Sequence, residues 1–136
     1  MKFEKSCGVI IFTCEENQIK YIIIQSINGI YGFPKGHVEG SETEIETALR
    51  EVSEEVGLMP NILDGFRETV EYYIPSSDIN KRVVYFVGEC ANQNIVYQKE
   101  ELLSAELMCF EEAIKCFTHE NNKELLIKAE AFIKSL

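Results

Sequence analysis

Three glutamates near the middle of this chain have the residue type and the spacing that could hold a metal ion. Glu51, Glu54 and Glu55 stand at i, i+3 and i+4 in a stretch whose apolar residues recur with helical periodicity. Their carboxylates should gather on one side of the last helical turns, where the helix dipole disfavours negative charge. Two carboxylates about 5–6 Å apart repel by roughly 3 kcal/mol at an effective dielectric of about 20. No Lys or Arg stands four residues from Glu51 to relieve that repulsion.

A divalent cation would turn this repulsion into attraction, because carboxylate oxygens are ligands that suit Mg²⁺ and Mn²⁺. The alternative is a solvated acidic face, which is the commoner reason for several glutamates on one helix. Taken alone, the three side chains favour that second interpretation. The residues around them decide the question.

In the helix expected to carry the glutamates, apolar residues recur at helical spacing over 43–56 and present one face to a core. Gly57 supplies the stop, since glycine readily takes the left-handed conformation that ends helices. Ser41 and Glu44 fit a capping box, which would start the helix around Glu42. The apolar face consists of Ile45, Ala48, Leu49, Val52 and Val56.

The segment 36–58, GHVEGSETEIETALREVSEEVGL, matches the Nudix box pattern G-x5-E-x7-R-E-U-x-E-E-x-G-U, in which U is a bulky aliphatic residue. Nine specified positions within one short segment make a chance match rare. The chain therefore resembles the Nudix hydrolases, which use a divalent metal and water to cleave a phosphoanhydride in nucleoside diphosphate derivatives. The defined positions are filled by Gly36, Glu42, Arg50, Glu51, Val52, Glu54, Glu55, Gly57 and Leu58.

The resemblance implies a set of metal ligands. Glu51 and Glu55 would be the principal ligands of Mg²⁺ or Mn²⁺, and Glu54 would share a second ion or assist the attacking water. The carbonyl oxygen of Gly36 would be a further ligand. A fourth acidic ligand often comes from outside the box in this family, and Glu101 is favoured for it over the preceding glutamate. Ordinary surface charge is the alternative for Glu101.

Arg50 and Glu42 complete the catalytic set that the resemblance implies. Arg50 would pair with Glu42 and orient the catalytic carboxylates, without touching the substrate. Its alternative partner is Glu46, four residues earlier, in an ordinary surface ion pair worth a few tenths of a kcal/mol. Which glutamate acts as the general base varies across the family, so that assignment stays open.

The stretch 29–51, GIYGFPKGHVEGSETEIETALRE, further resembles the asymmetrical diadenosine tetraphosphate hydrolases within the Nudix family. Those enzymes carry a similar PKGHVE sequence at the start of the box. They also carry a later loop followed by Lys-x-Val-x-Tyr, which Lys81, Val83 and Tyr85 match here. One departure is Gly40-Ser41, where these enzymes commonly have Pro-Gly before the first box glutamate.

This narrower resemblance implies residues that bind the substrate. Lys35, His37 and Lys81 are cations or donors that could hold the outer phosphates. Tyr72 or Tyr85 could stack on adenine. The alternatives are solvated lysines, a histidine that packs within its loop, and tyrosines that belong to the core.

The remaining sequence predicts an α+β fold, a Nudix-type α/β/α sandwich with a mixed β-sheet, in a single domain over residues 1–136. Residues 6–13 and 20–26 are expected to form a hairpin of two β-branched strands, and 27–36 an ordered loop with a short strand after it at His37 and Val38. Strands are expected at 66–74 and 82–90, shorter ones at 94–98 and 106–110, and helices at 110–117 and 123–136.

Composition and charge narrow the function classes. The net charge of −10 argues against a stable nucleic-acid partner, because phosphate contacts need clustered Lys and Arg. No apolar run is long enough to span a membrane, and the first residues do not resemble a secretory signal. The five cysteines include no C-x-x-C pair, which favours reduced thiols. We expect a cytoplasmic monomer that binds a small nucleotide.

The resemblances imply hydrolysis of a dinucleoside polyphosphate, with diadenosine tetraphosphate giving ATP and AMP. One alternative keeps the enzyme class but changes the substrate to a nucleoside triphosphate, a capped or 5′-triphosphorylated RNA or a diphosphoinositol polyphosphate. Another is a non-catalytic domain that senses a nucleotide. Such domains typically lose box glutamates, and all of them are present here.

Glu55→Gln tests the role assigned to the glutamates. Because the substitution keeps shape but removes charge, we expect it to abolish most metal-dependent hydrolysis while the fold survives. Steady-state kinetics would measure the loss, and circular dichroism would check the fold. A fully active variant would contradict the assignment.

Overall fold

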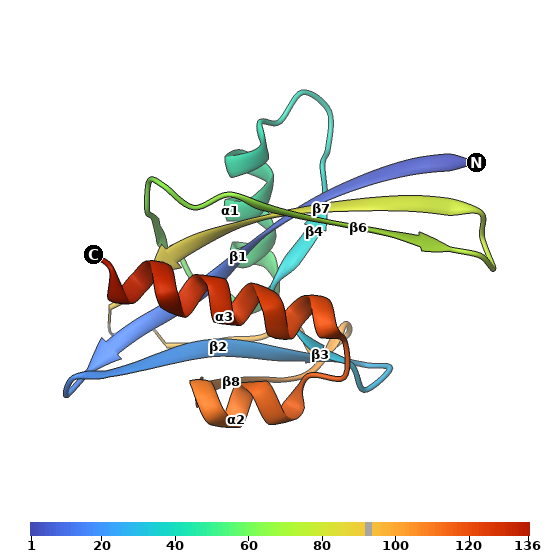
Figure 1. Ribbon diagram of the computed structural model, residues 1–136. Helices are drawn as coiled ribbons and strands as arrows, with labels where there is room; N and C mark the ends of the chain where they lie inside the picture. The colour runs from blue at the N-terminus through green and yellow to red at the C-terminus, as the bar shows by residue number, and fades with distance from the viewer. Residues whose placement is uncertain (92–93) are drawn as a thin grey trace.

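The computed structural model describes residues 1–91 and 94–136 (Figure 1). Helices cover both faces of one eight-stranded sheet. The strands are β1 (Lys2–Glu15), β2 (Gln18–Ser26), β3 (Tyr31–Gly32), β4 (Lys35–His37), β5 (Asn61–Ile62), β6 (Glu68–Ile74), β7 (Ile79–Glu89) and β8 (Leu102–Cys109). The helices are α1 (Glu44–Val56), α2 (Phe110–Cys116) and α3 (Glu120–Lys134).

The sheet is mixed. Strands β1 and β7 run parallel over eleven residue pairs, from Lys2–Ile79 to Phe12–Glu89. Every other described pairing is antiparallel, including the β1–β2 hairpin that the sequence predicted. The order β3-β2-β1-β7-β5 is extended by β4 against β1, β6 against β7 and β8 against β2. The prediction of an α+β fold with a mixed sheet is confirmed.

Strand β1 is buried on both faces, which explains its nearly continuous apolar run. Side chains alternate across the sheet: Val9 and Ile11 join the core beneath α1, whereas Ile10 and Phe12 join the core beneath α3. The two cores are therefore separated by one layer of sheet. A residue's position along β1 decides which helix layer its side chain meets.

Helix α1 starts two residues later than predicted. Its N-cap is Thr43, whose hydroxyl accepts a hydrogen bond from the N–H of Glu46 at 3.2 Å, while the Glu46 carboxylate accepts one from the N–H of Thr43 at 2.8 Å. The predicted box of Ser41 and Glu44 is wrong, because Glu44 pairs instead with basic side chains of β1 and of the connection before β6. Gly57 ends the helix with a φ of 69°, as expected.

The strand predicted at 94–98 is absent: these residues, all within the described part of the chain, lie in a segment without regular structure or sheet pairing. The N–H of Val96 donates to the carbonyl of Val56 at 3.1 Å, and the N–H of Gln98 donates to the carbonyl of Glu55 at 2.9 Å. These carbonyls belong to the last turn of α1, where helical partners are missing. The segment therefore caps a helix rather than extending the sheet.

Helix α3 covers the face of the sheet opposite α1 (Figure 1). It begins three residues earlier than predicted and buries the apolar side that the sequence indicated, with Leu125, Leu126, Ala129 and Ile133 in the core. Its Glu130 carboxylate accepts a hydrogen bond from the hydroxyl of the buried Tyr21 at 3.0 Å. Among the described helices, none is long and apolar enough to cross a membrane.

Thr43→Ala tests the observed cap of α1. Loss of the side-chain acceptor leaves one helical N–H unsatisfied, so we expect the free energy of unfolding to fall by about 1 kcal/mol. Ser41→Ala is the matched control and should leave it unchanged. Urea denaturation of both variants measures the two free energies of unfolding. A larger loss for Ser41→Ala than for Thr43→Ala would show that Ser41 is the N-cap.

Candidate active site

The carboxyl end of α1 packs against β4, and Gly36 makes that close approach possible. Gly36 pairs with Cys7 of β1 and so faces the α1 side of the sheet. A Cβ added to Gly36 would stand 2.0 Å from Cδ of Glu51. Any side chain at position 36 would therefore occupy the space of the Glu51 carboxylate. The glycine leaves a cradle in which this acid sits beside the backbone of β4.

Arg50 holds the acids of this region in place. Its Nε donates to Oε2 of Glu42 at 2.6 Å and its Nη2 to Oε1 of Glu42 at 3.0 Å, which is a bidentate pair. Nη2 also donates to the backbone carbonyl of His37 at 2.9 Å. Nη1 donates to Glu51 at 2.9 Å and to Glu54 at 3.3 Å. One side chain thus ties α1 to its own N-terminal connection and to β4.

These contacts confirm the expected pairing of Arg50 with Glu42 and correct two other expectations. Glu46, the alternative partner, is engaged in the helix cap instead. Glu51 does have a neutralising cation, which is its sequence neighbour Arg50 rather than a residue one turn away. The hydrogen bonds from Arg50 lower the pKa of Glu42 to about 2.

Glu55 is the acid that sits deepest, with 7% of its surface exposed. It accepts a hydrogen bond from the N–H of Lys35 at 3.3 Å. Burial, followed by the negative charge of Glu51, raises the pKa of Glu55 to about 8. Burial also raises the pKa of Glu51, and the charge of Glu101 acts on both acids in the same direction. The charge of Glu54 likewise acts on Glu51. The carboxylates of Glu51, Glu54, Glu55 and Glu101 therefore form one electrostatically coupled group of like charges.

The donor set fits a hard divalent cation. Its atoms are carboxylate and carbonyl oxygens, which suit Mg²⁺ and Mn²⁺. Crowded acids with raised pKa values are stabilised by a positive charge. Among the described Asp, Glu, His and Cys side chains, no three are already grouped at metal-binding distances. Arg50 engages Oε1 of Glu51 and Oε2 of Glu54, so a metal ion would be held through the second oxygen of each carboxylate.

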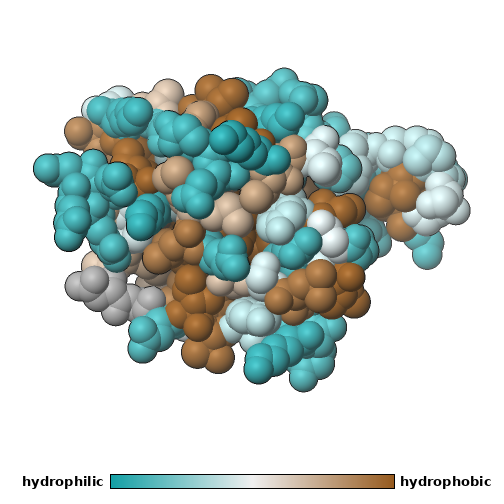
Figure 2. Space-filling view, turned by 90° about the horizontal axis from the view of Figure 1, so that it is seen from below, coloured by the Kyte–Doolittle hydropathy of each residue, from teal (hydrophilic) through white to brown (hydrophobic). Residues whose placement is uncertain are grey.

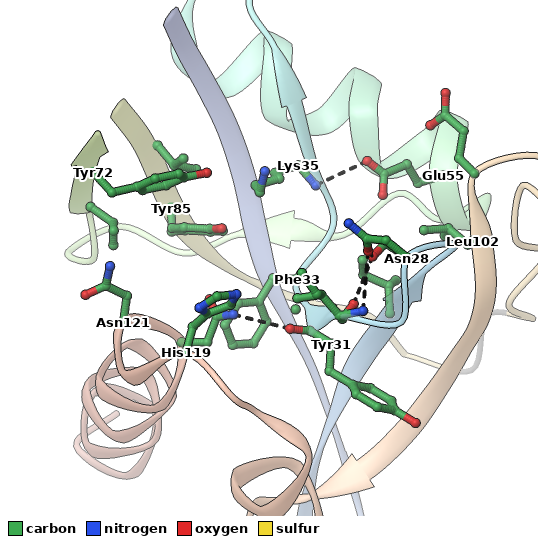
Figure 3. Close-up of a pocket in the computed structure, with 18 of the residues that line it drawn as sticks. Asn28, Tyr31, Phe33, Lys35, Glu55, Tyr72, Tyr85, Leu102, His119 and Asn121 are labelled. Atoms are coloured by element: carbon green, nitrogen blue, oxygen red, sulfur yellow. Dashed lines mark hydrogen bonds between the residues drawn. The ribbon is translucent and has the colours of Figure 1, made fainter. Parts of the chain in front are cut away.

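A cavity of about 800 Å³ opens beside the acids and brings together five of the predicted site residues (Figure 3). Glu55 and Lys35 lie along one wall, and Tyr72 and Tyr85 project from β6 and β7. Glu101 also lines this space. Tyr72 has 38% of its surface exposed, whereas Tyr85 has 3% and packs edge-on against Phe33 with ring centroids 5.8 Å apart.

His37 and Lys81 lie beside the cavity. The side chain of His37 is 59% exposed, with Nε2 3.8 Å from Oε1 of Glu4. Lys81 stands between Glu4 and Tyr72 in the sheet register. Burial, followed by the charge of Lys81, lowers the pKa of Lys35 to about 8. The two ammonium groups are therefore close neighbours.

Sequence reasoning missed several residues that line the same cavity. His119 and Asn121 face it from the start of α3 (Figure 3), and Asn122 donates to the carbonyl of Tyr31 at 3.3 Å. Asn28 reaches it from the loop after β2. These residues lie in a loop or at the start of a helix, and they carry no motif of their own. Only the folded arrangement of β2, β3 and α3 brings them to the glutamates.

Comparison with known proteins agrees with the geometry. The NUDIX domain family matches residues 3–129. The chain belongs to the Nudix family. This Nudix hydrolase is 30% identical to the asymmetrical bis(5′-nucleosyl)-tetraphosphatase of Sus scrofa over 148 residues, which cover 97% of each chain. It is 29% identical to the enzyme of the same name from Mus musculus, with 96% of each chain covered.

Solved structures show the same Nudix fold. A binary complex of the C. elegans Ap4A hydrolase superposes with a TM-score of 0.90 at 24% identity, covering 98% of this chain and 99% of the other. The NUDIX domain of Shewanella oneidensis NrtR, solved with ADP ribose, gives 0.79 at 17% identity, with 98% and 90% covered. Nudix enzymes generally use a divalent metal, and the oxygen donors of this site fit that chemistry.

Gly36→Ala tests the cradle around Glu51. The new Cβ overlaps the carboxylate, so we expect Mn²⁺ affinity to fall about tenfold or more, since displacement by roughly 1 Å can cost a hundredfold in function. Titration calorimetry with Mn²⁺ measures the loss. Gly32→Ala is the matched control, because its Cβ meets Asn122 only at 3.7 Å. Equal Mn²⁺ uptake by both variants would rule out the cradle.

Proposed function

We propose that this Nudix hydrolase cleaves dinucleoside polyphosphates asymmetrically, and that diadenosine tetraphosphate gives ATP and AMP. The observation that carries the proposal is the cavity whose lining joins Glu55 and Glu101 to Tyr72 and Lys35. Such a space can hold a base at one end and a polyphosphate at the other. The nearly full-length similarity to asymmetrical tetraphosphatases supports the same substrate class.

Glu51, Glu54, Glu55, Glu101 and the carbonyl of Gly36 would hold the metal. Bound Mg²⁺ or Mn²⁺ neutralises phosphate oxygens and lowers the pKa of a coordinated water. Glu55, which is the most buried of these acids, is one candidate for the general base. Glu54, which is half exposed, is the other candidate for that role.

Arg50 and Glu42 serve as positioning residues in this proposal. The bidentate pair fixes the guanidinium, and the guanidinium fixes the approach of Glu51 and Glu54 to β4. Removing Arg50 would leave the acids mutually repelling and free to move. The effect on rate would come through geometry rather than through contact with substrate.

Tyr72 is the better candidate for stacking on adenine. Its ring is partly exposed at the cavity wall, whereas Tyr85 is buried and forms part of the floor against Phe33. Base stacking on an exposed aromatic ring contributes about 1–3 kcal/mol. Lys35 lines the same cavity, and Lys81 pairs with Tyr72 in the sheet and acts electrostatically on Lys35. The phosphates of a bound dinucleotide would pass these two cations.

A second Nudix substrate class remains the alternative. The RNA pyrophosphohydrolase of Halorhodospira halophila is 38% identical, but over 60 residues that cover 42% of this chain. That share is too small to include the whole cavity. The strongly negative net charge also disfavours a long RNA.

A substrate panel tests the proposal. Diadenosine tetraphosphate, ATP, NADH, ADP-ribose and triphosphorylated RNA would each be offered with Mg²⁺, and chromatography would identify the products. We expect ATP and AMP from the first compound and little turnover of the others. Faster hydrolysis of ATP or RNA would reject the proposed substrate. Tight nucleotide binding without turnover would indicate a sensor.

A further inference from the structure

One buried hydroxyl has no hydrogen-bond partner among the described residues. Ser6 is 0% exposed, and its Oγ is neither donor nor acceptor in any contact. Leaving a buried polar group unsatisfied costs about 1–3 kcal/mol. Alanine would fit this strand position without that cost. None of the described residues supplies the hydrogen-bond partner that this buried hydroxyl would be expected to have.

Ser6 lies on the face of the sheet that carries the cavity. Its neighbours in β1 alternate, so Cys7 and Val9 pack beneath α1 while Ile10 faces the opposite core. In the sheet register Ser6 stands between His37 of β4 and Val83 of β7. Val83 is itself part of the cavity wall. Ser6 does not itself line the cavity, but its hydroxyl lies beside a strand residue that does, beneath the longer side chains of the same face.

Those longer side chains are cationic. Lys81 is two residues from Val83 on β7, and Lys35 is two residues from His37 on β4, so both are diagonal neighbours of Ser6. The ammonium groups of Lys35 and Lys81 repel one another. Glu4, two residues before Ser6 on the same face of β1, lies beside His37. Two crowded cations above an unsatisfied hydroxyl fit an anion with several acceptor oxygens.

We propose that the Ser6 hydroxyl donates a hydrogen bond to a phosphate oxygen of the substrate, between Lys35 and Lys81. The assignment rests on the proposed function and adds a specificity residue to it. Lysine side chains are long and flexible, so they can part around the oxygen that reaches the hydroxyl. Ser6 is placed neither at the metal nor at the attacking water, so the contact should strengthen ground-state and transition-state binding alike. We therefore expect it to act on KM more than on kcat.

Ser6→Ala separates a ligand contact from a structural role. Inorganic tripolyphosphate is the probe, titrated calorimetrically into the intact protein with and without Mg²⁺. We expect its dissociation constant to rise about ten- to a hundredfold, as for a lost hydrogen bond to a charged group. The thermal unfolding midpoint of the ligand-free variant should equal or exceed that of the wild type. Hydrolysis should show a raised KM with kcat nearly unchanged.

Thr13→Val is the matched control, because it removes another buried hydroxyl from β1. It should leave tripolyphosphate binding unchanged. A lower unfolding midpoint for Ser6→Ala with unaltered tripolyphosphate binding would overturn the proposal and make the hydroxyl structural. No binding of tripolyphosphate to the wild type would also overturn it. If the wild type binds tripolyphosphate through Ser6 but does not split diadenosine tetraphosphate, the proposed function fails while the phosphate contact stands.

Discussion

The guanidinium of Arg50 makes five hydrogen bonds, and they join three parts of the chain that must meet for the site to exist. Two go to Glu42, before the helix, and one to the carbonyl of His37 in β4. The remaining two go to Glu51 and Glu54, on the helix itself. The guanidinium group is planar and holds its N–H donors in fixed directions, so it can bind several acceptors from different parts of the chain at once. A lysine in its place would offer charge without the geometry.

The cavity exists because the sheet opens between β1 and β2. These strands pair only near their hairpin, from Phe12–Tyr21 to Glu15–Gln18. Further along, β1 pairs with β4 and β2 pairs with β3. The two short strands therefore fill a gap that the long strands leave. Glu55 of α1 and the tyrosines of β6 and β7 line the cavity beside these short strands.

The sequence alone predicted the helices and strands that have strong hydrophobic periodicity, and it revealed the Nudix box. The helix that carries the glutamates, the hairpin of β1 and β2, and the helix α3 all follow from local patterns. The strands β3 and β5 have two residues each, which is too short for periodicity to reveal. The segment before β8 looked like a strand because it is apolar, yet its N–H groups serve the end of α1. Local sequence patterns do not show that carbonyl groups in the last turn of α1 would bind these N–H groups.

The site was foreseeable only in part, for the same reason. Nudix positions identified the acids, and the PKGH segment identified Lys35 and His37. The residues that surround these side chains in the folded protein come from elements distant in the sequence. The orphan hydroxyl of Ser6 depends on which strands flank it, and His119 enters from the start of a remote helix. No spacing rule connects such residues before the chain has folded.

The parallel pairing of β1 with β7 joins residues that are far apart in sequence, such as Lys2 and Ile79. Contacts of this kind close long loops and lose chain entropy before they yield stability. Helix α1 lies inside that loop, so its acids remain apart from the far wall of the cavity until the loop has closed. A ribosome must therefore release well over half of this polypeptide before a nascent chain can acquire catalytic competence.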